Sequence, residues 1–439
     1  MYDTTRLTSV AAALVLLFSA PFAQAIDNAP SSATQGAAVS RPGLPAGAAM
    51  LKVDEYKETD VWGRIRSGYA IPDINNNLVE RHVKSYASKP DYMARISGRA
   101  SLYLYHVVQE LEKRGMPTEL ALLPVIESAF NPQALSTASA AGIWQFMPGT
   151  GKDFNLKQNM FKDERRGVLA STDAALTYLQ RLYTMFGDWQ LALAAYNWGE
   201  GNVLKAIKTN QSLGKPTDFE SLADLMPAET RNYVPKLQAV KNIVANPTQF
   251  NVTLPVIDNQ PYFTAVDKTS DIDVAVAAQL AEMSLDEFKA LNPQFKRPVI
   301  TGEKTKILLP KENAEKFHLN LAQWGQALSN WTTHRITSAK ESIGSLASKF
   351  GTTPEVIRQA NNIPAQTRLK AGSTILVPKT SASMHSDIAE NIIESAVVAL
   401  EADRGEKRSG ARTQRFKSKA VASSKNRVSR NTNSSRKHR

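Results

Sequence analysis

The chain has 439 residues, 42% of them hydrophobic and 21% charged, which is typical of globular proteins and long enough for about three domains. It contains no cysteine, which excludes disulfides, thiolate metal sites and lipid attachment to an N-terminal cysteine. The net charge of +12 is confined to residues 404–439, which hold 13 Lys or Arg and one acid, so the rest of the chain is neutral. The six histidines show no ligand spacing, and we expect no metal and no cofactor.

The N-terminus predicts a cleavable secretory signal over residues 1–25. An apolar run at 10–18 follows Arg6, and an A-x-A cleavage site ends at Ala25. The run is shorter than the ~20 residues that a membrane span needs, which disfavours an uncleaved anchor. Residues 26–54 are rich in Ala, Ser, Pro and Gly and are expected to be a linker.

Residues 55–250 are predicted to form one mostly helical domain. Apolar residues recur at helical spacing over 91–114, where Gly115 is a candidate C-terminal cap. A second helix is expected over 172–186. A third follows over 189–199, after Asp188 as its N-cap and ending at a glycine. Little of this region alternates as strands do.

An internal repeat of about 50 residues occupies the C-terminal half. Residues 284–292 (SLDEFKALN) match 353–361 (TPEVIRQAN), because each begins with a hydroxyl N-cap and ends in Asn. Residues 306–311 (KILLPK) match 374–379 (TILVPK) at nearly the same distance from that Asn. The second copy has the order strand, helix, helix, strand, which predicts a small βααβ module.

We therefore expect two small α+β modules over 256–312 and 331–380. An amphipathic connector at 313–330 joins them, and a short helix over 386–401 follows the second one. Residues 381–439 end in the basic tail, which has few aromatic residues and is expected to be disordered.

The stretch 121–148 contains one ionisable side chain, Glu127, and no acid follows until Asp153. The apolar residues before Glu127 should place it at the edge of a core. Partial burial raises the pKa of a carboxyl group, because desolvation disfavours the charged form. A Glu that stays protonated near neutral pH can act as a general acid.

The loop after Glu127 supplies Ser136, Gln145 and backbone amides. These groups can hydrogen-bond a neutral polar ligand such as a sugar without adding charge. Two aromatic neighbours, Trp144 and Phe146, fit two interpretations equally well. They could provide flat faces for sugar rings, or they could be ordinary core residues.

Three ordered motifs resemble the soluble-lytic-transglycosylase-like family of peptidoglycan-cleaving enzymes, and in particular its type D members. The resemblance spans roughly residues 55–380. It implies a lysozyme-like fold, and the C-terminal repeats resemble LysM modules, which bind glycans that contain N-acetylglucosamine. The motifs are ES at Glu127-Ser128 with Ser136 and GIWQFMP at 142–148, AYNWG at 195–199, and ETRNYV at 229–234.

The resemblance implies a peptidoglycan lyase in which one Glu serves first as acid and then as base. The bond between N-acetylmuramic acid and N-acetylglucosamine is cut without water, and the muramoyl 6-hydroxyl closes a 1,6-anhydro ring. Glu127 is the implied catalytic residue. The implied substrate-binding residues are Ser128, Ser136, Gln145, Phe146, Met147, Tyr196, Asn197 and Tyr233.

Two alternatives stay open at this point. A muramidase-type hydrolase on the same fold would need a second carboxylate, for which Asp153 or Asp163 could fold back near the site. A non-catalytic peptidoglycan-binding protein is the other, although a binding module would not need an isolated acid such as Glu127.

The chain departs from the family pattern in three places. The lipid-bearing Cys is absent, so we expect a periplasmic protein, associated with the cell wall or outer membrane, that is not a lipoprotein. The strand–turn motif of the second module is 340–343 (KESI) instead of Gly-Asp-Thr-Leu, and the first module has no clear equivalent. The basic tail is either a solvated terminus or a contact for anionic envelope polymers. Nucleic acid is not expected as a partner of an exported protein.

Overall fold

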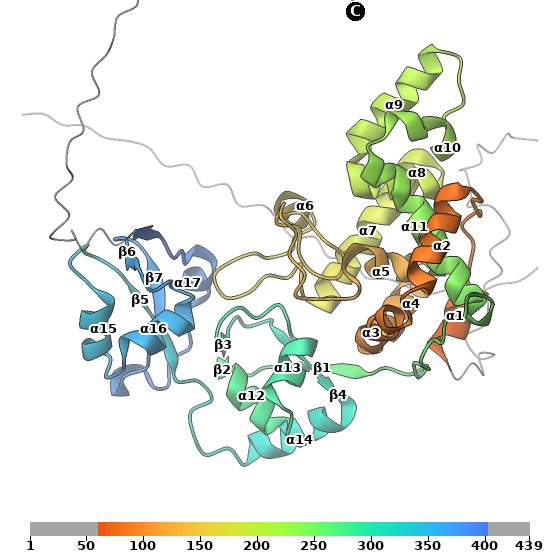
Figure 1. The fold of residues 1–439 in the computed structure, drawn as a ribbon. Coiled ribbons are helices and arrows are strands. Elements are labelled where there is room, and N and C mark those ends of the chain that lie inside the picture. Colours follow the sequence, from red (N-terminus) through yellow and green to blue (C-terminus); the bar gives the residue numbers. More distant parts are fainter. Residues whose placement is uncertain (1–59, 403–439) are drawn as a thin grey trace, which may run out of the picture. The chain divides into compact units, whose positions relative to one another are not determined.

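The computed structural model describes residues 60–402. The named elements between residues 60 and 250 are all helices, and those from 263 to 402 are helices and strands (Figure 1). Within the described range, named strands occur only from residue 263 onward, as expected from the lack of strand alternation before it. No helix in that range is long and apolar enough to cross a membrane. The predicted signal at 1–25, the linker at 26–54 and the basic tail at 404–439 lie outside the described residues.

The helical part is built around α11, which packs against α2, α5 and α8, while α7 packs against α8 (Figure 1). Its elements are α1 (Val61–Ser67), α2 (Asn77–Ala87), α3 (Pro90–Ala100), α4 (Leu104–Lys113), the 3₁₀ helix η1 (Thr118–Leu122), α5 (Leu123–Ser128), α6 (Pro148–Asp153), α7 (Val168–Phe186), α8 (Trp189–Trp198), α9 (Glu200–Ser212), α10 (Phe219–Leu222), η2 (Ala223–Leu225), α11 (Ala228–Ala245) and η3 (Pro247–Phe250).

Two of the predicted helices are confirmed. The helix predicted from residue 172 begins four residues earlier as α7 and ends before Gly187, whose φ of 66° suits glycine. Asp188 caps α8, because its carboxylate accepts a hydrogen bond from the Leu191 amide at 2.8 Å. The short connection through Gly187 and Asp188 lets α8 fold back onto α7.

The single helix predicted over 91–114 is wrong, since α3 and α4 are separate helices. The Ser97 hydroxyl donates to the Met93 carbonyl at 3.0 Å, and the Ser101 hydroxyl donates to the Gly98 carbonyl at 2.9 Å. Such serine-to-backbone bonds compete with the helical ladder, and Gly/Ser pairs are common at helix breaks. Both helices keep the same apolar spacing, so periodicity alone did not reveal the break. Gly115, with φ of 62°, ends α4 as predicted.

The two C-terminal modules share one topology, in which an antiparallel strand pair encloses two short helices. Strand β1 pairs with β4 from Phe263↔Pro310 to Asp267↔Lys306, and β5 pairs with β7 from Trp331↔Pro378 to Arg335↔Thr374. The elements are β1 (Phe263–Asp267), β2 (Ile272–Asp273), α12 (Val274–Leu280), α13 (Leu285–Leu291), β3 (Val299–Ile300), β4 (Lys306–Pro310), α14 (Lys311–Ala322), β5 (Trp331–Arg335), α15 (Ile343–Lys349), α16 (Pro354–Asn361), β6 (Thr367–Leu369), β7 (Thr374–Pro378), η4 (Ser381–Ser383), α17 (Glu390–Ser395) and β8 (Leu400–Ala402).

The repeated Asn has the same structural role in both modules. The Asn292 amide donates to the Leu308 carbonyl and accepts from the Leu308 N–H, both at 2.8 Å. The Asn361 amide makes the same pair of bonds with Leu376, at 2.8 and 2.7 Å. Both Asn residues are 2% exposed. Each amide therefore ties the end of the second helix to the last strand, and we call this pair of bonds the amide plug.

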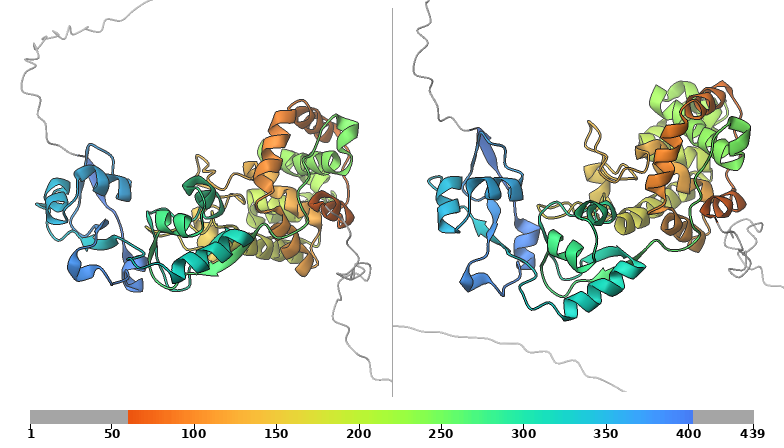
Figure 2. Two further views of the ribbon diagram at one scale, coloured as in Figure 1. Left: turned by 90° about the horizontal axis from the view of Figure 1, so that it is seen from below. Right: turned by 60° about the horizontal axis from the view of Figure 1, so that its bottom comes forward.

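Two connecting segments differ in how well the sequence predicted them. The amphipathic connector contains α14, which lies along strands β1 and β4 (Figure 2). The helix predicted over 386–401 is wrong in its second half, because α17 ends at Ser395 and β8 follows. Strand β8 pairs with β6 from Thr367↔Ala402 to Leu369↔Leu400. The β-branched pair at 397–398 favours this extended course.

Candidate active site

Glu127 lies in the last turn of α5, and residues 120–126, which precede it, are all apolar. The residues from Leu120 to Leu123 have no solvent exposure, so they anchor the helix in the core and fix the direction in which Glu127 points. The helix then stops abruptly, because Ala129 and Phe130 both adopt left-handed backbone, with φ of 52° and 53°. Two consecutive residues other than glycine in this region are strained, and such strain is concentrated at functional sites.

The carboxyl group of Glu127 accepts a hydrogen bond from the hydroxyl of Tyr233 in α11. Burial away from water raises the pKa of Glu127 to about 7, and the nearby negative charge of Glu229 raises it as well. The Tyr233 hydrogen bond and the positive charge of Lys236 act in the opposite direction. Glu127 therefore exchanges its proton near neutral pH, as a group that serves in turn as acid and base must.

Tyr196 in α8 forms the second side of the site. Its hydroxyl donates to the Trp144 carbonyl at 2.9 Å, and burial raises the pKa of Tyr196 well above its usual value, together with the charge of Glu127. Its ring lies 5.5 Å from that of Tyr178 and 6.5 Å from that of Phe146, between centroids. Tyr196 thus stays protonated and firmly held beside the carboxyl group.

The two aromatic residues of the loop belong to the core. Trp144 has no exposed surface, and its indole N–H donates to the Thr172 hydroxyl at 3.0 Å. Phe146 is 3% exposed and packs on Phe154 and Tyr196. Of the two interpretations left open by the sequence, the geometry favours the core, so we assign Phe146 to support of the site and not to a sugar contact. Met147, the next residue, is 43% exposed and available to a ligand.

Three polar residues expected to bind substrate use their side chains within the loop itself. The Ser128 hydroxyl donates to the Ile143 carbonyl at 2.9 Å, and the Gln145 amide donates to the Gly142 carbonyl at 2.8 Å. The Ser136 oxygen accepts from the Ala140 N–H at 2.9 Å. Ser136 and Gln145 are only partly buried, so their remaining donors and acceptors can still meet a ligand.

An ion pair between Arg165 and Asp163 holds this loop in place. The Arg165 guanidinium binds both oxygens of Asp163, at 2.7 and 2.9 Å, and donates to the carbonyls of Ser139 and Phe146. Gly142, with φ of 83°, passes so close to the Arg165 carbonyl that an added Cβ would lie 2.0 Å from its oxygen. Asp163 is thus a structural residue that holds the loop through Arg165.

The carboxylates that the sequence offered as a second catalytic group do not act on Glu127. Asp163 forms an ion pair with Arg165. Asp153, at the end of α6, is exposed, and its charge contributes to raising the pKa of Tyr178 instead. The acid that does act on Glu127 is Glu229, at the start of α11. Glu229 stands in the ETRNYV motif, four residues before Tyr233, and that spacing places the two side chains on one helical face.

Asn197, the remaining predicted residue, accepts a hydrogen bond from the Thr230 hydroxyl at 2.7 Å and thereby joins α8 to α11. Lys236 was not identified from the sequence, although it lies three residues after Tyr233 on the same helix. Among residues 60–402, no group of three His, Asp or Glu is arranged to hold a metal ion.

Three family models match successive parts of the chain. Residues 106–219, which include Glu127, match the Transglycosylase SLT domain, residues 262–326 the LysM-like domain of lytic transglycosylase MltD, and residues 339–378 the LysM domain. The membrane-bound lytic murein transglycosylase D of Escherichia coli is 36% identical over 330 residues, 72% of this chain and 72% of that protein.

More distant relatives match a smaller part of the chain. The membrane-bound lytic murein transglycosylase C of Glaesserella parasuis is 26% identical over 222 residues, 44% of this chain and 61% of that protein. The crystal structure of the 70-kDa soluble lytic transglycosylase of Escherichia coli superposes with a TM-score of 0.25 and 26% identity, over 33% of this chain and 23% of that one.

A helical SLT domain followed by LysM modules defines a transglycosylase of the SLT class. The predicted fold class, a mostly helical lysozyme-like domain followed by small α+β modules, is confirmed. From its identity and coverage with the Escherichia coli protein, the chain belongs to the membrane-bound lytic murein transglycosylase D family.

Proposed function

We propose that this protein is a peptidoglycan lytic transglycosylase that cleaves the β-1,4 bond between N-acetylmuramic acid and N-acetylglucosamine without water. Its family membership and its SLT domain support the activity. The observation that carries the mechanism is the Glu127 carboxyl group, whose pKa burial raises to about 7. At neutral pH a substantial fraction of Glu127 is protonated, and the other fraction is a carboxylate.

The first step uses the protonated form. Glu127 donates its proton to the glycosidic oxygen, and the N-acetylglucosamine side leaves as an alcohol. Positive charge develops on the anomeric carbon of the muramoyl residue. Glu127 becomes a carboxylate, which the Tyr233 hydroxyl stabilises by its hydrogen bond. Tyr233 is therefore a positioning residue for the acid in this proposal.

The second step uses the carboxylate. Glu127 removes the proton of the muramoyl 6-hydroxyl as that oxygen bonds to the anomeric carbon, and a 1,6-anhydro ring closes. The nucleophile belongs to the substrate, so no second carboxylate is needed to activate water or to attack. Intramolecular groups of this kind react with effective concentrations of roughly 10⁵ M or more when well oriented.

A hydrolase on the same fold is the second candidate, because Glu229 lies close enough to influence Glu127. If Glu229 activated a water molecule, the products would carry a reducing muramic acid. The deciding experiment digests purified sacculi with the full chain and weighs the products by mass spectrometry. Anhydro ends lack one water and support the lyase, whereas reducing ends that require Glu229 would replace it.

The LysM modules, which we assign to residues 256–312 and 331–380, are proposed to bind glycan strands and to take no part in the chemistry. Matches to two LysM-type domains support this role. Removing residues 256–380 should weaken cosedimentation with peptidoglycan and leave cleavage of soluble glycan fragments largely intact. Loss of activity on such fragments would mean that the modules support the catalytic domain instead.

We also propose export to the periplasm through cleavage after Ala25, which the A-x-A pattern supports. N-terminal sequencing of the native protein tests this, and retention of residues 1–25 in a membrane fraction would contradict it. The charge of residues 404–439 supports contact with anionic envelope polymers. Their removal should lower retention on heparin without changing turnover, and an unchanged elution salt concentration would leave only a solvated terminus.

A further inference from the structure

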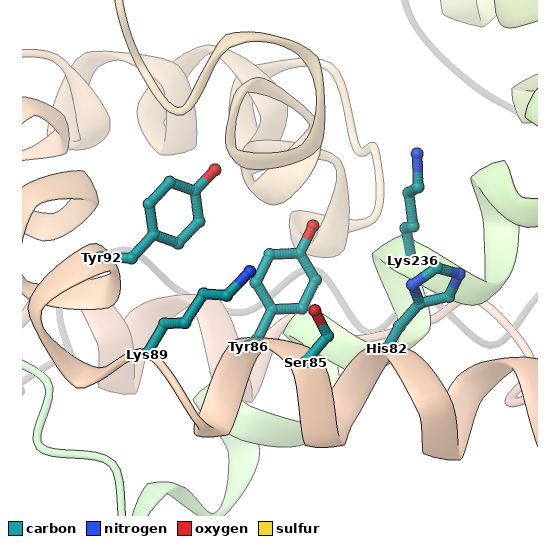
Figure 3. A pocket seen from close by; sticks show the side chains of 6 residues that line it. All are labelled: His82, Ser85, Tyr86, Lys89, Tyr92 and Lys236. Carbon is teal, nitrogen blue, oxygen red and sulfur yellow. The ribbon is translucent and has the colours of Figure 1, made fainter.

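A pocket of about 220 Å³ opens between α2, the start of α3 and α11 (Figure 3). None of the family motifs includes the residues of α2 or α3 that line it. Its volume is below the roughly 300–1,000 Å³ of sites for drug-sized ligands, so it suits a single side chain or a terminal group. The lining residues are His82, Ser85, Tyr86, Lys89, Tyr92 and Lys236.

The pocket is cationic. Its lining includes Lys89 and Lys236 and no acidic residue. Within the part of the chain that the structure describes, neither lysine forms a salt bridge, whereas Arg64 and Lys241 of the same helical part do. In Figure 3 the two lysines lie on either side of Tyr86, and Ser85 presents its hydroxyl between them. An anion would meet three polar donors there without displacing any partner.

The pocket also has an apolar side. The rings of Tyr86 and Tyr92 are stacked, with centroids 6.3 Å apart and planes inclined by 15°. Both rings are only partly buried, so part of their surface is available to the aliphatic portion of a ligand. Burial raises the pKa of Tyr86 to about 12, and its hydroxyl therefore remains a hydrogen-bond donor at neutral pH.

Helix α11 connects the pocket to Glu127. Lys236 follows Tyr233 by three residues, which puts the two side chains on neighbouring positions of one face. The charge of Lys236 acts on the Glu127 carboxyl group. Asn232 on the same helix binds the His82 ring at 2.8 Å and so fixes α2 against α11. A ligand group in the pocket thus lies within electrostatic range of the catalytic carboxyl group.

We propose that this pocket binds a carboxylate of the peptide stem that the muramoyl residue carries, so that stem-bearing strands are preferred over bare glycan. The inference rests on the proposed function. In a stem-bearing strand the sugars are neutral, because the carboxyl group of each muramoyl residue is bound to its stem in an amide. The stem is the part of this substrate that combines carboxylates with aliphatic carbon. Two free ammonium groups beside two tyrosine rings are complementary to that combination.

The test compares kcat/KM of the full chain on three soluble glycan strands of equal length. One carries stems with free carboxylates, one carries stems with amidated carboxylates, and one has had its stems removed by an amidase. The variant is Lys89→Met, which removes an exposed ammonium group and keeps the aliphatic stem. The matched control is Lys84→Met, because Lys84 is an exposed lysine of the adjacent helix α2 that does not line the pocket.

The wild-type protein should prefer strands with free carboxylates over both other substrates. Lys89→Met should reduce that preference by about 3- to 5-fold, the size expected of a partly exposed ion pair, and Lys84→Met should not change it. The inference is overturned if Lys89→Met leaves the preference unchanged, or if the wild-type protein cleaves strands with amidated stems as efficiently as strands with free carboxylates. Absence of anhydro products from all three strands would instead contradict the proposed function.

Discussion

Two carboxyl groups eight residues apart, Glu119 and Glu127, lie in similarly apolar surroundings and are treated in opposite ways by the fold. Glu119 is 1% exposed, and its Oε1 atom accepts from the backbone N–H groups of Ala70 and Ile71, both at 2.8 Å. The Lys241 ammonium lies 3.0 Å from the same oxygen. Within residues 60–402, the Glu127 carboxyl group accepts a hydrogen bond from Tyr233 and forms no salt bridge, and burial raises its pKa to about 7.

The difference shows how one helical domain can use the same residue type for structure and for chemistry. A buried carboxylate is tolerated when a cation and several donors replace its water shell, as they do for Glu119. Glu127 lacks a direct cation, so its charged and neutral forms are close in free energy at neutral pH. The first group is held in the fold by a cation and two backbone donors, and the second has a pKa that suits proton exchange near neutral pH.

The largest effect expected from this contrast is on activity in Glu127→Gln. The amide keeps the shape of the side chain but can neither donate nor accept the proton, so both catalytic steps fail together. We expect kcat to fall by at least roughly 10²–10⁴-fold, the usual contribution of general acid–base catalysis. The readout is release of 1,6-anhydro products, and near-normal release would remove the catalytic assignment.

The same variant should be more stable than the wild type at pH 8. The pKa of Glu127 in the folded state, about 7, lies above the ordinary Glu value of 4.5. The folded state therefore binds the proton more tightly and loses stability as pH rises from about 4.5 to 7. The full cost is about 3 kcal/mol at 1.36 kcal/mol per pKa unit. Glu127→Gln should regain part of it in urea unfolding at pH 8 and gain little at pH 4.

Glu119→Gln should do the reverse, with a large loss of stability and little change in the chemistry of the folded enzyme. Removing the charge of Glu119 leaves Asp73, whose side chain is 69% exposed, as the remaining carboxylate beside the buried Lys241 ammonium. We expect a loss of about 3 kcal/mol, the lower end for such pairs. Urea unfolding measures it, and a folded variant with unchanged stability would show that Asp73 alone suffices for Lys241.

Tyr233→Phe should give an intermediate effect with a distinct pH signature. The Tyr233 hydrogen bond lowers the pKa of Glu127, so its removal raises that pKa further. The alkaline limb of kcat/KM, which reports deprotonation of the acid, should therefore move to higher pH, and the maximal rate should fall roughly 10-fold. A reduced rate with an unmoved limb would mean that Tyr233 contacts the substrate and does not tune the acid.

Glu229→Gln should have the smallest effect on the rate, and it should shift the pKa of Glu127 in the opposite direction to Tyr233→Phe. Its charge raises the pKa of Glu127, so the variant should shift the alkaline limb to lower pH, with less than about a 3-fold change in the maximal rate. Measuring the pH–rate profiles of Tyr233→Phe and Glu229→Gln in parallel distinguishes a shift of the alkaline limb to higher pH from a shift to lower pH. Loss of activity as complete as in Glu127→Gln would favour the two-carboxylate hydrolase.

The sequence predicted Glu127 because one acid in a long apolar stretch can be recognised without knowing the fold. It could not predict the partner of Glu127, since the face of α11 that turns inward depends on packing against α2, α5 and α8. Tyr233 was therefore expected to contact sugar, whereas its hydroxyl binds the carboxyl group. Glu229 and Lys236 were missed as its charged neighbours for the same reason.

Residues within the loop show a related limit. Ser136 and Gln145 were recognised as polar groups near the acid, but their bonds to Ala140 and Gly142 depend on the tight path of the loop. That path is held by Arg165, which follows it in the sequence by many residues and carries no motif of its own. Periodicity was sufficient for α7 and α8, and insufficient where serine hydroxyls interrupt the helix between α3 and α4.

The amide plug of each LysM-type module has a consequence for how such proteins change over evolution. Asn292 bonds to Leu308 in the first module, and Asn361 bonds to Leu376 in the second. Each pair of bonds therefore lies entirely within its own module. A duplicated segment that carries its helix end and last strand together brings along everything needed to close it. Such a unit keeps its own closing bonds when it is copied or moved.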